Sequence, residues 1–461
     1  MRRFKVFLNV VMRISNNYHI ITFGCQANIS DSERIAHILE ELGYRATFKI
    51  NEADVLIINT CSVRQVAEDK VLGRAPKLQT FKDKNPNLKV ILTGCMLHHN
   101  LSRLKGILPP IDIFLPIKDL WKLPKLLGKD LKINPQEYLS FDSKYQSNFS
   151  AFVPISYGCN NFCTYCIVPF SRGREYSRPK EEIISEIKKL ANKNYKEIWL
   201  LGQNVNSYGL EEKTVWNNKT RKNFIPKIQR GRCSFNTLLE EIDKIKGDFW
   251  LRFISPHPKD FSEKTIDVLS RLKHFVHYIN LPVQSGDDEI LKKMNRPYTV
   301  SHYKELIKKI RKAMPDMAIS TDVIVGFPGE TQKQFLSTAK LFREIGYDMA
   351  FISKYSPRPQ TAAAASFKDD VTWAEKNRRF EVLNEILKKT AKFRNKKFEG
   401  QTIKVLFSEY KNGFLLGKNE QYKTVKVLAD NNKAQKFVGN FAKVKIKKGR
   451  EWGLEGEMVY E

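Results

Sequence analysis

The residues best suited to chemistry in this sequence are three closely spaced cysteines, Cys159, Cys163 and Cys166, in a CxxxCxxC pattern. They follow a short apolar run at residues 152–156. Three thiolates on one tight loop can hold three irons of a cubic 4Fe-4S cluster, which leaves the fourth iron open to a small molecule. A structural zinc site instead requires four ligands, commonly as two CxxC-like pairs. The spacing therefore favours an iron-sulfur cluster with one open coordination position.

Three further cysteines, Cys25, Cys61 and Cys95, each come at the end of an apolar, strand-like run that helix-like sequence follows. Such alternation predicts a small parallel α/β unit. Ligand sites of open α/β sheets form at the carboxyl ends of the strands, so these three thiolates can converge on a second cluster. The alternative is that buried cysteines simply pack well in a sheet, but three at equivalent places favour the cluster. The three runs cover residues 19–23, 54–60 and 89–94.

Length and charge bound the class of protein. A chain of 461 residues is long for one domain, and its 42% hydrophobic content is ample for two or three cores. The formal net charge of +29, from 79 Lys and Arg against 50 Asp and Glu, suggests a polyanionic partner such as RNA or DNA. A basic bias of the whole proteome would give the same excess, so charge only supports this interpretation.

The seven cysteines are clustered rather than spread as a disulfide framework, which indicates metal ligation in a reducing cytosol. No apolar run approaches the ~20 residues of a membrane helix. The first eleven residues are only faintly like a signal peptide, because Lys5 and Asn9 interrupt them, and Met12 is an alternative start. We therefore expect a soluble cytoplasmic protein, and nothing in the pattern requires more than a monomer.

Six strand-like runs recur from the CxxxCxxC loop onward, each ending in polar or glycine residues and separated by helical patterns such as residues 179–191 and 301–314. Repeated βα units predict a parallel barrel, full or partial, with its chemistry at the carboxyl ends of the strands. The six runs cover residues 152–157, 197–205, 249–258, 278–286, 318–328 and 348–357.

In the carboxyl-terminal part, the spacing of the apolar residues changes. Residues 372–398 predict a long amphipathic helix, and from Gly400 the sequence alternates between apolar and polar residues. Short strands with Gly and Asn turns predict a small closed β-barrel. Residues 120–150, between the first unit and the cysteine loop, are predicted to be a linker or crossover. The predicted strands cover residues 402–407, 413–416, 424–427 and 441–446.

The motifs TFGCQAN, NTCSVR and TGC around Cys25, Cys61 and Cys95, together with the CxxxCxxC loop, resemble those of the radical S-adenosylmethionine (radical SAM) methylthiotransferases. The resemblance extends over nearly the whole chain. It implies an α/β protein with an amino-terminal domain at 17–130, a partial (β/α)6 radical SAM barrel at 145–390 and a TRAM-like RNA-binding β-barrel at 398–461. It also implies two 4Fe-4S clusters, an auxiliary one on the first three cysteines and one on Cys159, Cys163 and Cys166 that binds S-adenosylmethionine.

The segments LLGQNVNSYG (residues 200–209) and DVIVGFPGET (residues 322–331) resemble those that line the S-adenosylmethionine pocket in this family. Ordinary turn glycines are the alternative for the second segment. Polar residues at the predicted barrel mouth are the catalytic candidates, and a structural salt bridge is the alternative for the arginine among them. The proposed cofactor-binding residues are Tyr165, Gln203, Asn204, Ser255, Gln284, Gly326 and Pro328. The proposed catalytic residues are Gln203, Arg252 and Asp322.

The segments VPFSRGREYSRP (residues 168–179), LLGQNVNSYG and TFGCQAN resemble the MiaB-type branch of the family more than its other branches. Those other branches act on threonylcarbamoyladenosine of tRNA or on an aspartate of a ribosomal protein. The resemblance to the MiaB-type branch implies transfer of a methylthio group to carbon 2 of N(6)-isopentenyladenosine, at tRNA position 37 beside the anticodon. The expected partners are the tRNA anticodon stem-loop and an electron donor such as flavodoxin or ferredoxin. A rival of another class is a non-catalytic iron-sulfur redox sensor that binds RNA, which would not need the glycine-lined pocket.

Two segments depart from the family pattern. Residues 211–235 form a basic, turn-rich insertion that contains Cys233, which we predict is not a cluster ligand. The insertion could contact RNA or be a solvated loop. In the last domain the usual GRT-like signature is replaced by Gly417, Lys418 and Asn419. The lysines predicted to contact phosphates there are Lys418, Lys423, Lys426, Lys443, Lys445, Lys447 and Lys448.

Overall fold

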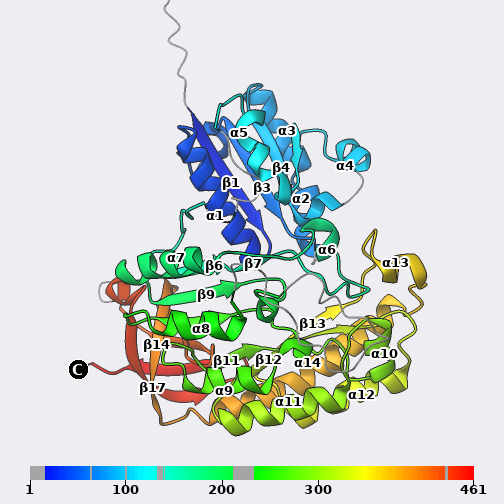
Figure 1. Ribbon diagram of the computed structural model, residues 1–461, viewed down its shortest axis with the longest axis vertical. Coiled ribbons are helices and arrows are strands. Elements are labelled where there is room, and N and C mark those ends of the chain that lie inside the picture. Colours follow the sequence, from blue (N-terminus) through cyan, green and yellow to red (C-terminus); the bar gives the residue numbers. More distant parts are fainter. Residues whose placement is uncertain are drawn as a thin grey trace, which may run out of the picture. The chain divides into compact units, whose positions relative to one another are not determined.

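The computed structural model of the chain describes residues 16–62, 65–98, 101–131, 139, 141–210, 233–430 and 434–460. It forms two compact units, Met1–Lys144 and Tyr145–Glu461 (Figure 1). Both candidate start residues and most of the predicted insertion lie outside the described residues. The part of the chain that is described contains no helix long and apolar enough to cross a membrane.

The first unit is built on a five-stranded sheet with the strand order β2-β1-β3-β4-β5, and every pair in it is parallel. All six residues of β3 are buried, as expected for a strand of a parallel sheet that is covered on both faces. The prediction of a parallel α/β unit is therefore confirmed. The strands are β1 (Asn17–Phe23), β2 (Arg45–Ala46), β3 (Val55–Thr60), β4 (Lys89–Gly94) and β5 (Ile113–Leu115).

Helices cover this sheet, and the alternating side chains of β3 enter two separate apolar clusters. Val55 and Ile57 pack in the cluster that includes α1, whereas Leu56 and Ile58 pack in the other. Part of the predicted linker belongs to this fold, because Leu123 and Leu127 are buried in the first cluster. The helices are α1 (Gln26–Glu41), α2 (Gln65–Leu72), α3 (Ala75–Lys84), α4 (Leu101–Ile107) and α5 (Leu123–Leu126).

The second unit contains the six predicted strands as two parallel three-stranded sheets, β10-β9-β6 and β11-β12-β13. A parallel bridge between Leu251 and Phe275, just before β11, joins the two sheets. The partial barrel expected from the sequence is thus present. Its strands are β6 (Ser150–Pro154), β9 (Glu197–Leu201), β10 (Trp250–Phe253), β11 (Tyr278–Asn280), β12 (Ala318–Val325) and β13 (Met349–Lys354).

Helices line the outside of these strands (Figure 1), and one large apolar core fills the space between the two layers. Several helices begin where the sequence supplies a capping side chain; Thr372, for example, accepts the Glu375 N–H at the start of α14. The predicted long helix at 372–398 is therefore confirmed almost to the residue. The helices are α6 (Val168–Ser171), α7 (Lys180–Asn192), α8 (Phe235–Asp243), α9 (Glu263–Arg271), α10 (Asp288–Lys293), α11 (Val300–Ala313), α12 (Gln332–Ile345), α13 (Ala362–Ser366) and α14 (Trp373–Lys396).

A closed five-stranded barrel, with the strand order β14-β15-β16-β18-β17, follows α14. The sequence predicted four of these strands and missed the last, residues 454–458, which pairs with β17 and runs parallel to β16. That strand closes the barrel, so it becomes recognisable only when its two neighbours are in place. The strands are β14 (Thr402–Lys411), β15 (Phe414–Asn419), β16 (Thr424–Leu428), β17 (Phe441–Gly449) and β18 (Leu454–Met458).

Arg252 joins the two barrels. Its Nε donates to Glu197 Oε1 at 2.8 Å, and its terminal nitrogens donate to the backbone carbonyls of Asn419 and Glu420 at 2.8 and 2.9 Å. The guanidinium is fully buried and faces the ring of Tyr422, which packs edge-on against Trp199. This is the structural salt bridge that the sequence left open as the alternative to a catalytic role.

The position of Arg252 along the barrel strands accounts for its structural role. Glu197 is the first residue of β9, so the guanidinium lies toward the amino ends of the strands. Ligand sites of parallel barrels form at the opposite, carboxyl ends. A second ion pair at the joint, between Lys423 and Asp348 at 2.7 Å, is buried on both sides. Lys423 is therefore engaged within the protein, which contradicts its predicted contact with phosphate.

The other lysines predicted to contact phosphates differ in their exposure to solvent. Lys418 is largely buried, and its Nζ donates to Thr424 Oγ1 at 2.8 Å and lies 4.6 Å from the centroid of the Tyr422 ring. Burial lowers the pKa of Lys418 to about 8, and the nearby Arg252 charge acts in the same direction. Five lysines of β16 and β17 are exposed on the outer face of the closed barrel: Lys426, Lys443, Lys445, Lys447 and Lys448.

We expect Lys418→Met to change the pH dependence of stability. The unfolded state holds the Lys418 proton up to a higher pH than the folded state does, so wild-type stability rises with pH above about 8. The variant lacks this rise. Relative to wild type, its free energy of unfolding should therefore fall by about 1–3 kcal/mol between pH 7.5 and pH 10. Thermal unfolding followed by circular dichroism measures the difference.

Lys445→Met is the matched control, because Lys445 is an exposed lysine of the same barrel. Its difference from wild type should not change over this pH range. Equal pH profiles for the Lys418 and Lys445 variants would contradict the assignment of a buried charge at Lys418.

Candidate cluster and cofactor sites

Cys25, Cys61 and Cys95 leave three adjacent parallel strands at the same level. Phe23 of β1 pairs with Thr60 of β3, and Thr60 pairs with Gly94 of β4, so each strand ends beside its neighbour. Cys61 continues the pattern, since its N–H donates to the Phe23 carbonyl at 2.7 Å. Strand pairing therefore places the three thiols, which are distant in sequence, at one edge of the sheet.

The Cys61 thiol is in contact with those of Cys25 and Cys95. Hydrogen bonding of the Cys61 thiol to the Cys25 and Cys95 sulfurs is the main cause that raises the pKa of Cys61, and burial adds to the effect. Within the described residues, no three His, Cys, Asp or Glu side chains are arranged as ligands of one metal ion. A cubic 4Fe-4S cluster requires a different ligand geometry from a single metal ion. Each thiolate binds a different iron, so the ligand sulfurs stand apart around the cluster. Three cysteines at one sheet edge supply the type and number of ligands that a cubic cluster with one open iron requires.

Two buried asparagines brace this edge, and the prediction from sequence missed both. Asn28 Oδ1 accepts the Cys25 N–H at 3.3 Å, and Asn28 Nδ2 donates to Asn59 Oδ1 at 3.0 Å. Asn59 donates back to the Asn28 carbonyl at 2.8 Å. Gly94 has φ +96°, and a side chain there would meet the Thr60 carbonyl at 2.3 Å. The letters N in QAN and NTC, and G in TGC, were the signal that could have identified them.

The second set of cysteines lies on the loop between β7 (Ser156–Tyr157) and α6. The loop folds back on itself, since Cys166 N–H donates to the Cys163 carbonyl at 2.9 Å. Burial raises the pKa of Cys159, and the nearby Cys166 and Cys163 raise it further. The structure thus brings Cys159, Cys163 and Cys166 together at the carboxyl end of the first barrel strand, as the sequence predicted.

The segment after α10 holds this loop in place. Thr164 N–H donates to the Met294 carbonyl at 3.1 Å, and Asn295 Nδ2 donates to the Phe162 carbonyl at 3.1 Å. Arg296 reaches the loop as well, with its Nη1 3.5 Å from Cys163 Sγ. Sequence reasoning did not predict this contact, because no motif links the two positions.

Tyr165, the aromatic residue predicted to lie near the adenine of the cofactor, is partly buried. It packs against an apolar cluster that contains Met294 and Phe327. Phe327 belongs to the predicted cofactor segment GFPGET, so the structure brings these two parts of the predicted pocket together. Contact with adenine stays a prediction.

Three polar residues near the predicted barrel mouth present buried atoms toward the carboxyl ends of β9 and β10. Gln203 Oε1, Asn204 Oδ1 and His257 Nε2 are buried without a hydrogen-bond partner among the described residues. Asn204 is held by its other atom, since its Nδ2 donates to Asp260 Oδ2 at 2.8 Å. Buried polar groups are normally satisfied, so these atoms fit a site that a polar ligand completes.

Ser255 and Gln284, two predicted cofactor-binding residues, both have a left-handed backbone, with φ of 57° and 70°. Such non-glycine conformations cost about 1–3 kcal/mol and cluster at functional sites. Gln284 N–H donates to the Asp322 carbonyl at 2.9 Å, and Asn280 Nδ2 donates to Asp322 Oδ2 at 2.8 Å. Asp322, a predicted catalytic residue, is half-buried and lies within β12, where its backbone carbonyl contacts Gln284 and its carboxylate contacts Asn280.

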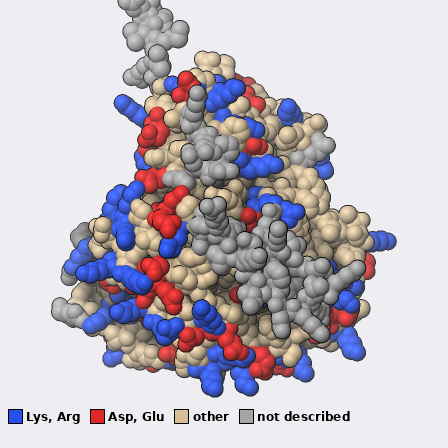
Figure 2. All heavy atoms as spheres, viewed as in Figure 1, with Lys and Arg blue, Asp and Glu red and all other residues tan. Residues whose placement is uncertain are grey.

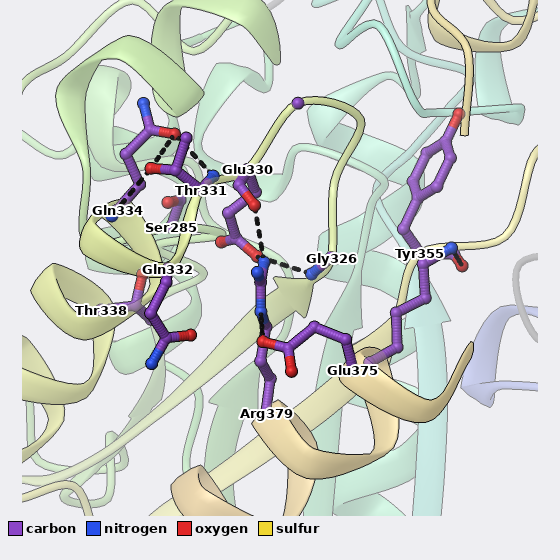
Figure 3. A network of polar contacts seen from close by, with 12 residues as sticks. Ser285, Gly326, Glu330, Thr331, Gln332, Gln334, Thr338, Tyr355, Glu375 and Arg379 are labelled. Carbon is purple, nitrogen blue, oxygen red and sulfur yellow. Dashed lines mark hydrogen bonds and ion pairs between the residues drawn. The ribbon is translucent and has the colours of Figure 1, made fainter. Parts of the chain in front are cut away.

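The predicted cofactor loop at Gly326 and Pro328 is buried and held by an ion pair (Figure 3). Gly326 has φ +69°, and its N–H donates to Glu330 Oε2 at 2.6 Å. Arg379 of α14 donates to the same carboxylate at 2.6 Å and to the Glu330 carbonyl at 2.9 Å. Burial raises the pKa of Glu330, while the Gly326 N–H and Arg379 oppose the rise. Helix α14 thereby fixes a loop more than 40 residues earlier.

We expect Arg379→Met to destabilise the protein by about 3–5 kcal/mol at pH 7.5, because it leaves the buried Glu330 carboxylate without its cation. The loss should shrink toward pH 5, where protonation of Glu330 removes the unpaired charge. Urea unfolding at the two pH values measures both effects.

Arg378→Met is the control for this prediction. Arg378 is the preceding residue of α14, but its side chain is 47% exposed and pairs with Glu375. An exposed ion pair contributes about 0–1 kcal/mol, so this variant should be close to wild type. Equal losses in the Arg378 and Arg379 variants would show that the buried pair has no special role.

Three family descriptions match the chain. "Uncharacterized protein family UPF0004" matches residues 17–116, "Radical SAM superfamily" matches residues 153–342, and "TRAM domain" matches residues 396–459. The first range lies in the parallel sheet unit, the second covers the partial barrel up to α12, and the third covers the closed barrel.

Curated relatives match over almost their full length. Proteins named "tRNA-2-methylthio-N(6)-dimethylallyladenosine synthase" from Thermoanaerobacter sp. (strain X514) and Clostridium botulinum (strain Hall / ATCC 3502 / NCTC 13319 / Type A) are each 40% identical to this chain. The first alignment covers 96% of this chain and 92% of the relative, and the second covers 97% and 98%. The relative from Dictyoglomus thermophilum is also 40% identical, over 96% of this chain and 99% of its own.

A solved structure shares the fold. The radical S-adenosylmethionine methyltransferase TsrM from Kitasatospora setae, with tryptophan substrate and a SAM analog bound, superposes with a TM-score of 0.56 over 76% of this chain and 75% of that chain. Its identity of 13% supports the fold alone. The domain matches and the full-length relatives place this chain in the radical SAM methylthiotransferase family, among the tRNA-2-methylthio-N(6)-dimethylallyladenosine synthases.

Proposed function

We propose that the chain adds a methylthio group to carbon 2 of N(6)-isopentenyladenosine at position 37 of tRNA, beside the anticodon. The observation that carries this proposal is the presence of two separate groups of three cysteines, each brought together at the carboxyl ends of parallel strands. A single cluster with an open iron would suffice for cofactor cleavage. Sulfur insertion gives a reason for the second group.

The residues fit the two cofactors that the family implies. Cys25, Cys61 and Cys95 would hold the auxiliary 4Fe-4S cluster, and Cys159, Cys163 and Cys166 would hold the cluster that binds S-adenosylmethionine. When bound, these cofactors supply the radical and sulfur chemistry that no side chain can perform at an inert C–H bond. The protein's part is to bind, orient and shield them.

The remaining predicted site residues receive roles as part of this proposal. Tyr165 and the Gly326–Pro328 loop form an apolar and backbone surface for the cofactor. Gln203, Asn204, Ser255 and Gln284 supply polar contacts at the strand ends, where two of them hold unpartnered buried oxygens. Asp322 is kept as a candidate catalytic residue because it is a half-buried carboxylate residue of a barrel strand, held by Asn280 Nδ2.

We place the domains at 17–130, 145–390 and 398–461, with tRNA as the partner of the last. The five lysines on the outer face of the closed barrel are exposed and can reach a phosphate backbone, unlike Lys418 and Lys423. On the face shown in Figure 2, Lys and Arg are interspersed with acidic residues, so the net charge alone does not mark an RNA site. A flavodoxin or ferredoxin as electron donor, a cytoplasmic location and a monomeric state belong to the same proposal.

Replacing the two cysteine groups separately tests the division of labour. Wild-type protein reconstituted without oxygen should contain about eight irons, and each triple Ala variant should contain about four. The Cys159/Cys163/Cys166 variant should release no 5′-deoxyadenosine on reduction. The Cys25/Cys61/Cys95 variant should still release it but should not thiolate tRNA, as judged by mass spectrometry of digested nucleosides.

The iron content of wild type decides how that experiment is interpreted. About four irons in wild type, falling to none in the Cys159/Cys163/Cys166 variant, would mean that the first three cysteines are not ligands. Thiolation by the Cys25/Cys61/Cys95 variant would contradict the proposed source of sulfur.

Removing positive charge from the closed barrel tests its role in tRNA binding. We expect the triple change Lys426→Gln, Lys445→Gln and Lys448→Gln to weaken tRNA binding. The slope of log affinity against log salt should become shallower by about 0.9 for each phosphate that the variant no longer neutralises. S-adenosylmethionine cleavage should be unaffected. Filter binding of tRNA at several salt concentrations gives the slope.

The control removes the same charge from helices α9 and α11, with Lys264→Gln, Lys308→Gln and Lys312→Gln, all exposed residues. This variant should keep the wild-type slope. If the two triple variants behave alike, the closed barrel has no specific part in binding tRNA.

A further inference from the structure

Arg296 lies between α10 and α11 and is buried, with 7% of the residue exposed. Each of its three nitrogens donates one hydrogen bond. Nε donates to Tyr298 Oη at 2.8 Å, Nη2 to the Pro282 carbonyl at 3.0 Å, and Nη1 to Cys163 Sγ at 3.5 Å. One edge of this buried guanidinium is thus directed at a proposed cluster ligand.

The charge of Arg296 has no carboxylate partner among the described residues; its neighbours are a phenol, a carbonyl and a thiol. Three other buried arginines of the same unit do pair with a carboxylate: Arg178 with Glu186, Arg252 with Glu197, and Arg379 with Glu330. An arginine remains protonated in a protein, and a buried charge is costly unless it is compensated. Among these three neighbours, the group best able to take up negative charge on binding iron is the sulfur of Cys163.

The guanidinium is also fixed in place. Tyr298 Oη, which accepts from Arg296, contacts the carbonyls of Pro282 and Val283 at 3.1 and 3.0 Å. The next residue toward the amino end, Asn295, has φ 55° and donates to the Phe162 carbonyl of the cysteine loop. Both ends of the contact are therefore held by other bonds, so the distance from guanidinium to sulfur does not depend on a flexible side chain.

We propose that Arg296 raises the reduction potential of the cluster held by Cys159, Cys163 and Cys166, through its hydrogen bond and charge at the Cys163 sulfur. This inference rests on the proposed function, because it requires that cluster. Uptake of one electron from an external reductant adds one negative charge to the cluster. The fixed cation stabilises that charge, and hydrogen bonds to ligand sulfurs are a known means by which proteins set cluster potentials. Arg296 acts as a positioning residue with no part in bond making.

The test measures the midpoint potential in the full-length chain with Cys25, Cys61 and Cys95 changed to Ala, so that only one cluster contributes. A titration with dithionite, followed by electron paramagnetic resonance of the reduced cluster, gives the midpoint. Adding Arg296→Met should shift it to a more negative value while iron stays at about four per chain. Arg296→Lys keeps the charge but not the planar fork, so its midpoint potential should lie between those of the parent and the Arg296→Met protein.

Arg311→Met in the same background is the matched control. Arg311 also donates to backbone carbonyls, but these belong to Ile345 and Gly346 at the end of α12 rather than to the cysteine loop. Its midpoint should equal that of the parent. The affinity for S-adenosylmethionine, measured by equilibrium dialysis, should be the same in all four proteins.

Iron content distinguishes a failure of the cluster assignment from a failure of the role proposed for Arg296. A parent without iron would overturn the assignment of the cluster itself. A parent with about four irons, and Arg296 variants that hold the same iron but titrate at the parent midpoint, would overturn only the role of Arg296. An unchanged midpoint together with weaker S-adenosylmethionine binding would assign Arg296 to the bound cofactor instead.

Discussion

Parallel pairing of neighbouring strands is the constraint on which both candidate centres depend. In a parallel sheet all strands end at the same edge, so residues far apart in sequence meet there without any further device. The pairing of Phe23, Thr60 and Gly94 places Cys25, Cys61 and Cys95 side by side in the first unit. In the second unit the same rule places the cysteine loop, Ser255, Gln284 and the Gly326 loop at the carboxyl ends of the barrel strands.

Buried arginines perform different tasks in the second unit according to what faces them. Arg252 meets one carboxylate and two carbonyls of the closed barrel, and its task is to join the two barrels at the amino ends of the strands. Arg379 meets Glu330 and holds the loop that is expected to receive the cofactor. Arg296 contacts the Cys163 thiol and has no carboxylate partner among the described residues. Because a buried charge without a partner is costly, each of these arginines requires its partner groups to stay in place.

Several non-glycine residues around the candidate sites have a left-handed backbone conformation. The non-glycine residues with left-handed φ include Phe162 in the cysteine loop, Asn295 that holds the loop, and Ser255 and Gln284 at the strand ends. Folding energy from the apolar core between the strands and helices has to offset these conformations. These four positions belong to the cysteine loop, the segment that holds it and the strand ends, whereas Asn194, Gln360, Asn412 and Tyr422 have a left-handed φ elsewhere in the second unit.

The sequence by itself determined the element types and the candidate ligands. Apolar runs ending in Gly, Cys or polar residues predicted nine of the parallel strands. The CxxxCxxC spacing indicated three candidate ligands, and the strand-end positions of Cys25, Cys61 and Cys95 indicated three more, because each signal lies in a short stretch of sequence. Only the tertiary structure decided what Arg252, Lys423 and Arg296 do, since each is defined by a partner more than 70 residues away. The fifth strand of the closed barrel and the Asn28–Asn59 brace were decided in the same way. A side chain's type fixes which bonds it can make, but only the fold brings a particular partner within hydrogen-bonding distance.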